Sequence, residues 1–133
     1  MAKILDVGHI QLYTTDLQKS VHFYEALGGK LLRYEDIALG ERTIHMAMVS
    51  LGSTAVELSE RSEFVAPDYK TLPCICHYCL TVDDLPAFVQ ELRSKGIDSF
   101  ETEGINHMTI WGGISSIFLR GPSNEKIELL QKK

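Results

Sequence analysis

The apolar and polar positions of the chain follow one order twice: a strand, a helix and then three strands. In the first half, alternation over 10–14 predicts a strand. Asp16 then precedes apolar residues at three- and four-residue steps, which predicts a helix that Asp16 caps and Gly28 ends. Apolar segments separated by turn residues predict the other three strands of this half over 31–37, 44–51 and 55–59.

The second half repeats this order after a polar connector. Asp84 is placed to cap a helix, Pro86 is tolerated in its first turn, and Gly96 ends it. We therefore expect a single domain over 1–133 in which 61–73 connects two modules, 1–60 and 74–133. The segment 101–113 has no regular pattern, and the last three strands are predicted over 97–100, 114–119 and 126–130.

Two histidines and two glutamates stand at matched places in the two modules. The stretch around His9 aligns with that around His77, and each module closes on a strand with a glutamate, Glu57 or Glu128, between apolar residues. Such a carboxylate points to the other face of its sheet, where it is costly unless paired or ligated. A single strand histidine or glutamate is usually structural. The recurrence of both favours four ligands around one divalent cation.

Composition and charge exclude several function classes. The 133 residues are 44% hydrophobic and 23% charged, as in an ordinary soluble globular protein, and a net charge of −5 offers no basic patch for nucleic acid. No apolar run approaches the roughly 20 residues that cross a bilayer, and the first residues show no signal-peptide pattern. We expect a cytoplasmic protein that binds neither nucleic acid nor membranes.

Three cysteines, Cys74, Cys76 and Cys79, lie close together in the sequence, as in a zinc knuckle. On a strand, however, side chains alternate between faces, so Cys76 and Cys79 cannot share a metal ion. An odd number of cysteines without a secretory signal also argues against disulfides. We expect these cysteines to be reduced and buried as small apolar residues.

Three motifs accompany this order of elements: Gly8-His9-Ile10, a helix that ends in Phe-Tyr-x-x-Leu-Gly, and a closing Gly-Pro-x-x-x-x-Ile-Glu-Leu. With them the chain resembles the glyoxalase, or vicinal oxygen chelate, superfamily over essentially its whole length. The resemblance implies an α+β fold in which two tandem βαβββ modules form a cupped mixed sheet. It also implies a divalent metal in the cup, Zn, Ni, Co, Mn or Fe(II), with four ligands as in the glyoxalase I and methylmalonyl-CoA epimerase branches: His9, Glu57, His77 and Glu128.

The function that this resemblance implies is a metal-dependent lyase or isomerase that abstracts a proton next to a carbonyl. Glu128 is the expected base and Glu57 the alternative, and Tyr13, Met108 and Trp111 are expected to line the substrate side. A metal-free binding protein and an Fe(II) dioxygenase with three ligands stay open as alternatives. The expected partners are a small-molecule substrate and a second copy of the chain in a homodimer.

Tyr13 departs from the pattern of one branch. Glutathione-dependent glyoxalases similar to this chain commonly have an arginine four residues after the first histidine. Without that arginine, the glutathione carboxylate would lose a charge-assisted partner. Glutathione is therefore a disfavoured substrate, whereas the metal site is unaffected.

Overall fold

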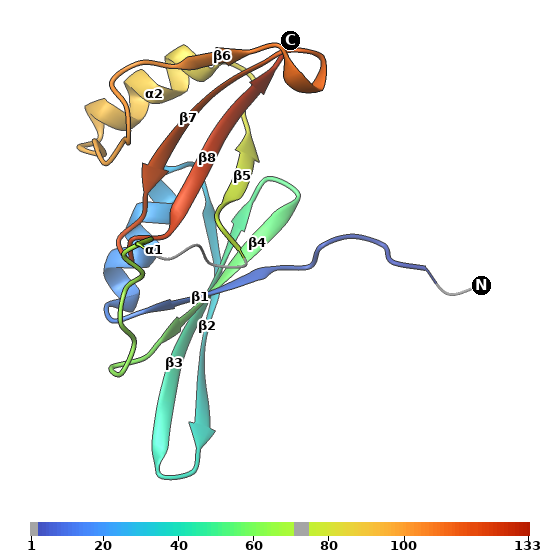
Figure 1. Cartoon of the computed structure of the whole chain (residues 1–133). Coiled ribbons are helices and arrows are strands. Elements are labelled where there is room, and N and C mark those ends of the chain that lie inside the picture. Colours follow the sequence, from blue (N-terminus) through green and yellow to red (C-terminus); the bar gives the residue numbers. More distant parts are fainter. Residues whose placement is uncertain (1–2, 71–74) are drawn as a thin grey trace. The chain divides into compact units, whose positions relative to one another are not determined.

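The computed structural model describes residues 3–70 and 75–133 (Figure 1). The chain divides into two compact units, Met1–Val65 and Ala66–Lys133, which are described one at a time. Within the described residues, each unit has one mixed four-stranded sheet and one α-helix. The predicted α+β fold of two tandem βαβββ modules is confirmed.

Unit 1 is a sheet with strand order β1-β4-β3-β2, covered on one face by helix α1. β1 and β4 run parallel, and the other neighbouring strands run antiparallel. The parallel pair is adjacent because the chain crosses from β1 through α1, β2 and β3 before β4 returns beside β1. The elements are β1 (Ile10–Thr14), α1 (Leu17–Ala26), β2 (Lys30–Leu39), β3 (Arg42–Leu51) and β4 (Thr54–Glu60).

A side-chain cap begins α1, and a glycine ends it. The Asp16 carboxylate accepts the backbone N–H of Lys19 at 3.0 Å, as a helix N-cap does, and the chain leaves the helix through Gly28 at a φ of 98°. One stripe of the helix packs against alternate residues of the sheet, which removes their apolar surface from water at roughly 1.5–3 kcal/mol for each large side chain. The buried residues of this core include Leu17, Val21, Tyr24, Val49, Val56 and Leu58.

Unit 2 repeats the arrangement with strand order β5-β8-β7-β6, and β5 and β8 are the parallel pair. Its helix α2 is capped by Asp84, whose carboxylate accepts the backbone N–H of Ala87 at 3.0 Å. The buried core of this unit includes Leu85, Val89, Leu92, Ile117, Leu119, Ile127 and Leu129. The elements are β5 (Tyr78–Thr81), α2 (Leu85–Ser94), β6 (Asn106–Met108), a 3₁₀ turn (Ile110–Gly112), β7 (Ile114–Arg120) and β8 (Lys126–Lys132).

The strand predicted over 97–100 is wrong. In this segment only Phe100 makes a bridge, to Leu119 at the end of β7. The strand that pairs along β7 is β6, which lies in the segment 101–113 that showed no regular pattern. β6 already pairs with β7 from Ile114 to Ser116. Residues 97–100 can therefore hydrogen-bond only to the C-terminal end of β7.

The expected burial of the cysteines is also wrong for the two that the structure describes. Cys76 and Cys79 are both exposed, and Cys74 lies outside the described residues. The physical reason is their position. Cys76 precedes β5, and Cys79 pairs with Glu128 on the sheet face that α2 does not cover.

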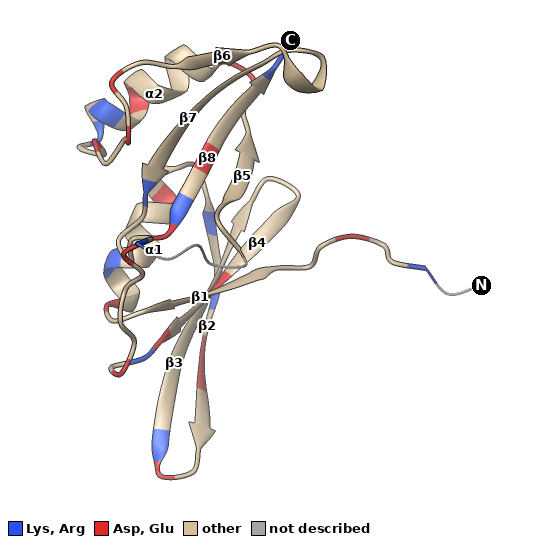
Figure 2. Ribbon diagram, in the orientation of Figure 1, with Lys and Arg blue, Asp and Glu red and all other residues tan. Residues whose placement is uncertain are grey.

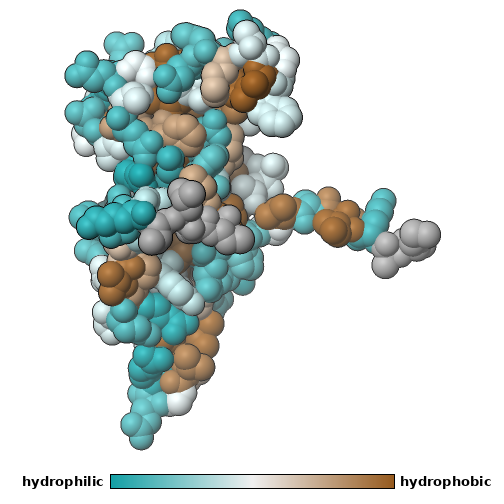
Figure 3. All heavy atoms as spheres, in the orientation of Figure 1, coloured by the Kyte–Doolittle hydropathy of each residue, from teal (hydrophilic) through white to brown (hydrophobic). Residues whose placement is uncertain are grey.

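Two surface features are visible in the space-filling and charge views. Acidic and basic residues are interspersed along both units (Figure 2). The segment before β1 carries apolar side chains that contribute nothing to the core of unit 1, since Ile4 is 91% and Leu5 81% exposed (Figure 3). The described part of the chain contains no helix with the length and apolarity needed to cross a membrane.

Candidate metal and substrate site

The two predicted glutamates lie on the face of each sheet that is opposite its helix. In β4, Val56 and Leu58 are buried in the core of unit 1, so the side chain of Glu57 between them points the other way. Glu128 in β8 has the same relation to its buried neighbours Ile127 and Leu129. We call these two surfaces the open faces. By strand register, that of unit 1 carries Gln11, Tyr13, Met46, Met48, Glu57 and Ser59, and that of unit 2 carries Cys79, Phe118 and Glu128.

On unit 1, the predicted histidine and glutamate meet. His9 stands directly before β1, and its Nε2 atom is 3.7 Å from Oε2 of Glu57. The other carboxylate oxygen, Oε1, accepts a hydrogen bond from the side-chain amide of Gln11 at 2.6 Å. Gln11 is the register partner of Glu57 in the parallel β1–β4 pair. Glu57 is therefore held by Gln11 while it presents its second oxygen to His9.

On unit 2, the equivalent pair is closer. Nε2 of His77 lies 3.1 Å from Oε2 of Glu128, and the His77 ring packs edge-on against Phe118 with centroids 5.0 Å apart. Cys79 is the register partner of Glu128 in the parallel β5–β8 pair. Partial burial of this thiol, followed by the negative charge of Glu128 beside it, raises the pKa of Cys79 to about 11. Cys79 thus stays a neutral thiol next to the carboxylate.

Gln11 and Cys79 are neighbours of the two glutamates that sequence analysis did not include in the candidate site. Both stand two residues after a histidine, and both are the register partner of the glutamate of their unit. The signal that could have found them is parallel register: β1 pairs with β4 as β5 pairs with β8. Because a donor to a ligating carboxylate orients that carboxylate toward its metal, Gln11 would support Glu57 as a ligand, and Cys79 stands at the equivalent place beside Glu128.

The separations within each pair suit two ligands of one metal ion. Imidazole nitrogen and carboxylate oxygen bind such ions at about 2.0–2.2 Å, so neighbouring ligands stand roughly 3 to 3.5 Å apart. The 3.1 Å between His77 and Glu128 falls within that range, and the 3.7 Å between His9 and Glu57 lies just above it. Within residues 3–70 and 75–133, no group of three or more potential ligands gathers at one place, so each unit presents a pair.

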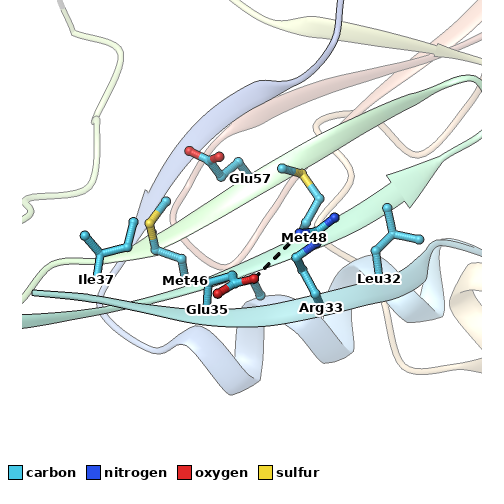
Figure 4. A pocket seen from close by; sticks show the side chains of 8 residues that line it. Leu32, Arg33, Glu35, Ile37, Met46, Met48 and Glu57 are labelled. Atoms are coloured by element: carbon cyan, nitrogen blue, oxygen red, sulfur yellow. Dashed lines mark ion pairs between the residues drawn. The ribbon is translucent and has the colours of Figure 1, made fainter.

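A cavity of about 350 Å³ lies on the open face of unit 1, and Glu57 forms part of its wall (Figure 4). The floor is mainly apolar, with the thioethers of Met46 and Met48 beside the carboxylate. The one ion pair in the lining joins Arg33 to Glu35, with 3.6 Å between Nη1 and Oε1. Its other lining residues are Leu32, Ile37 and Ala47. The cavity is large enough for the apolar part of a small molecule that lies next to Glu57.

The three residues expected to line the substrate side lie in different environments. Tyr13 is on the open face of unit 1, where it is 46% exposed and its ring lies 5.4 Å from the guanidinium carbon of Arg61. Met108 pairs with Ile114 and so shares the open face of unit 2 with Glu128. Trp111 is 84% exposed in the 3₁₀ turn at a left-handed φ of 55°. Their roles toward a substrate stay predictions.

The remaining histidines have other surroundings. His22 is exposed on α1, His45 contacts the Asp36 carboxylate at 2.8 Å, and His107 hydrogen-bonds to Ser115. None of them contacts Glu57 or Glu128 among the described residues. They are useful controls for the two histidines that do.

Comparison with known proteins decides the family. Residues 6–129 match the family model of the Glyoxalase/Bleomycin resistance protein/Dioxygenase superfamily. The chain belongs to this superfamily. The match covers both units, so the paired histidines and glutamates lie within the part of the chain that defines this family.

Solved structures of superfamily members confirm the fold. The glyoxalase family protein from Enterococcus faecalis is 23% identical, with a TM-score of 0.76 over 94% of this chain and 96% of that one. A glyoxalase/bleomycin resistance protein/dioxygenase domain from Frankia sp. EAN1pec is 21% identical, with a TM-score of 0.77 over 98% and 94%. At these identities the likeness shows the fold alone.

A curated relative has a named activity. Human mitochondrial methylmalonyl-CoA epimerase is 28% identical over 102 residues, which are 73% of this chain. The chain spans 57% of the length of that enzyme. The similarity thus covers most of this chain but little more than half of the relative.

Proposed function

We propose that this protein is a metal-dependent lyase or isomerase that removes a proton from the carbon next to a carbonyl of a small oxygenated substrate. The observation that supports this most directly is the repeated pair, His9 beside Glu57 and His77 beside Glu128. Membership of the superfamily and the similarity to an epimerase favour the same class of reaction.

The proposed ligands of one divalent cation, Zn, Ni, Co, Mn or Fe(II), are His9, Glu57, His77 and Glu128. Two imidazoles and two carboxylates are a donor set that such ions accept, and availability decides among them. When bound, the cation supplies Lewis-acid stabilisation of the negative charge that develops on the substrate oxygens. The four ligands come either from one chain or from two chains of the proposed homodimer.

Glu128 is the proposed base, with Glu57 as the alternative. Glu128 is the better shielded of the two, with 12% of its side chain exposed against 21% for Glu57. It would take the proton from the carbon next to the carbonyl and return it to the same carbon, in an epimerisation, or to its neighbour, in an isomerisation. Neither step needs an oxidant. The apolar cavity beside Glu57 would hold the rest of the substrate.

Metal analysis of the purified full-length protein tests the ligand set. We expect one equivalent of divalent metal per chain in the wild type and clearly less after each alanine substitution of the four ligands. The double variant His9→Ala, His77→Ala should retain almost none. His22→Ala and His45→Ala are matched controls, because these histidines lie away from both glutamates, and they should keep the wild-type content.

Unchanged metal content in the His9→Ala, His77→Ala variant would contradict the proposed site. Two equivalents per chain would show that each pair binds its own ion. A protein without metal that still binds small molecules would instead fit the metal-free binding members of the superfamily. Oxygen consumption with candidate substrates would favour a dioxygenase.

A further inference from the structure

Arg61 is a cation on the open face of unit 1. Arg61 directly follows β4, and its backbone N–H donates to the carbonyl of Thr14 at 2.8 Å, which extends the β1–β4 ladder. Alternation along this extended strand puts Arg61 on the same face as Glu57 and Ser59. Within the described residues, no carboxylate forms an ion pair with its guanidinium.

The nearest acidic residues in the sequence are engaged elsewhere. The Glu60 carboxylate accepts the backbone N–H of Leu17 at the start of α1, at 2.8 Å. Glu63 accepts a hydrogen bond from Arg42 at 3.2 Å. The positive charge of Arg61 is therefore not neutralised by either neighbour.

The guanidinium of Arg61 is nevertheless held in place. Its Nε donates to the hydroxyl of the fully buried Ser59 at 3.2 Å, and its Cζ lies 5.4 Å from the centre of the Tyr13 ring. Tyr13 is in turn packed against Phe64, with ring centroids 6.0 Å apart. In the described part of the chain, the two terminal nitrogens of Arg61 have no acceptor. A positioned guanidinium with free N–H groups is a receptor for a carboxylate.

The Arg61 side chain, the cavity and Glu57 all lie on the open face of unit 1. Ser59, which holds Arg61, is the register partner of Met46, and Met46 lines the cavity beside Glu57. Glu57 and Arg61 are four residues apart on one strand, roughly 13 Å at about 3.3 Å per residue. The hydrogen bond to Ser59 turns the Arg61 side chain back along the strand, which shortens that span.

We propose that Arg61 recognises an anionic group of the substrate, so that the substrate is a carboxylate whose carbon chain lies against Met46. This inference rests on the proposed function, because it takes the proposed metal site, of which Glu57 is one ligand, as the reacting end. Tyr13 stands where similar glutathione-dependent glyoxalases commonly have an arginine. Here its ring positions a cation that comes from the end of β4 instead.

The test is a titration of the full-length protein with hexanoate and with hexanamide, its uncharged equivalent, followed by NMR. In the wild type, hexanoate should shift the Arg61 Nε–H and the Tyr13 ring resonances and bind more tightly than hexanamide. Arg61→Gln should lower hexanoate affinity roughly five- to tenfold and abolish the preference over hexanamide, as expected for loss of a partly exposed charge-assisted bond.

Two further variants make the result specific. Arg42→Gln removes the same charge from a residue already paired with Glu63, and it should keep the wild-type preference for hexanoate. Arg61→Lys keeps the charge and should retain part of the preference, which a merely unfolded protein would not do. Equal binding of hexanoate and hexanamide by the wild type, or equal effects of Arg61→Gln and Arg42→Gln, would overturn the inference.

Failure of this inference is distinguishable from failure of the proposed function. The His9→Ala, His77→Ala variant lacks two proposed metal ligands but keeps Arg61, so it should still prefer hexanoate. Loss of metal in that variant would support the metal site. If, in the same experiments, neither the wild type nor any variant preferred hexanoate, the role of Arg61 would be refuted while the metal site stayed supported.

Discussion

At the scale of single residues, each glutamate of the candidate site is paired in parallel register with a residue of the first strand of its unit. Gln11 is the partner of Glu57 and donates a hydrogen bond to it, whereas Cys79 is the partner of Glu128. The two units thus place chemically different side chains at equivalent positions beside their glutamates.

The proposed role of Glu128 as a base can be separated from its proposed role as a ligand. Glu128→Gln keeps a coordinating amide oxygen, so it should retain much of the metal, but it cannot accept the proton. We expect incorporation of solvent deuterium next to the carbonyl to fall on the order of 10²–10⁴-fold at matched metal occupancy. Glu57→Gln is the comparison and should exchange faster. Wild-type exchange in both variants would rule out proton abstraction by either glutamate.

His45 provides a pH-dependent contribution to stability that is independent of the site. The hydrogen bond from His45 to Asp36, and then the Asp36 charge, raise the pKa of His45 above its usual value. Protonation therefore favours the folded state, and this stabilisation is present below about pH 6.5 and lost as the pH rises through the raised pKa.

Asp36→Asn should accordingly lower the denaturant midpoint at about pH 5.5 and leave it unchanged at about pH 9. The effect should be small because both side chains are exposed. In a His45→Ala background the same substitution should have no pH-dependent effect. An equal loss of stability at both pH values would show that the ion pair is not its source.

At the scale of elements, the turn from α1 into β2 requires that residue 29 has no side chain, which only glycine provides. A Cβ atom on Gly29 would lie 2.7 Å from the carbonyl oxygen of Tyr24 and 3.0 Å from that of Ser50. Both are backbone atoms that cannot move aside. Gly29→Ala should destabilise the protein by about 1–3 kcal/mol, measured by chemical denaturation.

Gly104→Ala is the matched control for this substitution. A Cβ atom on Gly104 meets nothing within 4 Å, so its free energy of unfolding should change by no more than about 1 kcal/mol. Equal denaturant midpoints for the two variants would mean that the end of α1 accommodates a Cβ atom at residue 29 without loss of stability. Activity is not needed for this measurement.

The helices followed from the sequence more accurately than the strands. Asp16 and Asp84 cap their helices as predicted, because the cap is a hydrogen bond between residues three apart. The strand neighbouring β7 was missed, because pairing depends on which segment reaches the edge of the sheet. Asn106 to Met108 reach it, although three residues are too few to show alternation.

At the scale of the whole molecule, bound metal should contribute to the stability of the folded chain. A ligand that binds only the native state stabilises it by mass action, by about 2.7 kcal/mol at one hundred times its dissociation constant. Dialysis against a chelator should therefore lower the melting temperature of the wild type and of His22→Ala. The His9→Ala, His77→Ala variant should not respond. A wild type that melts at the same temperature before and after dialysis would contradict the four-ligand site.

The sequence by itself determined the order of elements, the caps of both helices, and the matched places of His9, Glu57, His77 and Glu128. These follow from local rules, since alternation and capping act over a few residues. Tertiary structure alone decided that Gln11, 46 residues before Glu57, is its donor, that Arg61 lies over Tyr13, and that Glu57 borders a cavity. Strand order and parallel register bring such residues together, and neither is encoded in the neighbourhood of any one residue.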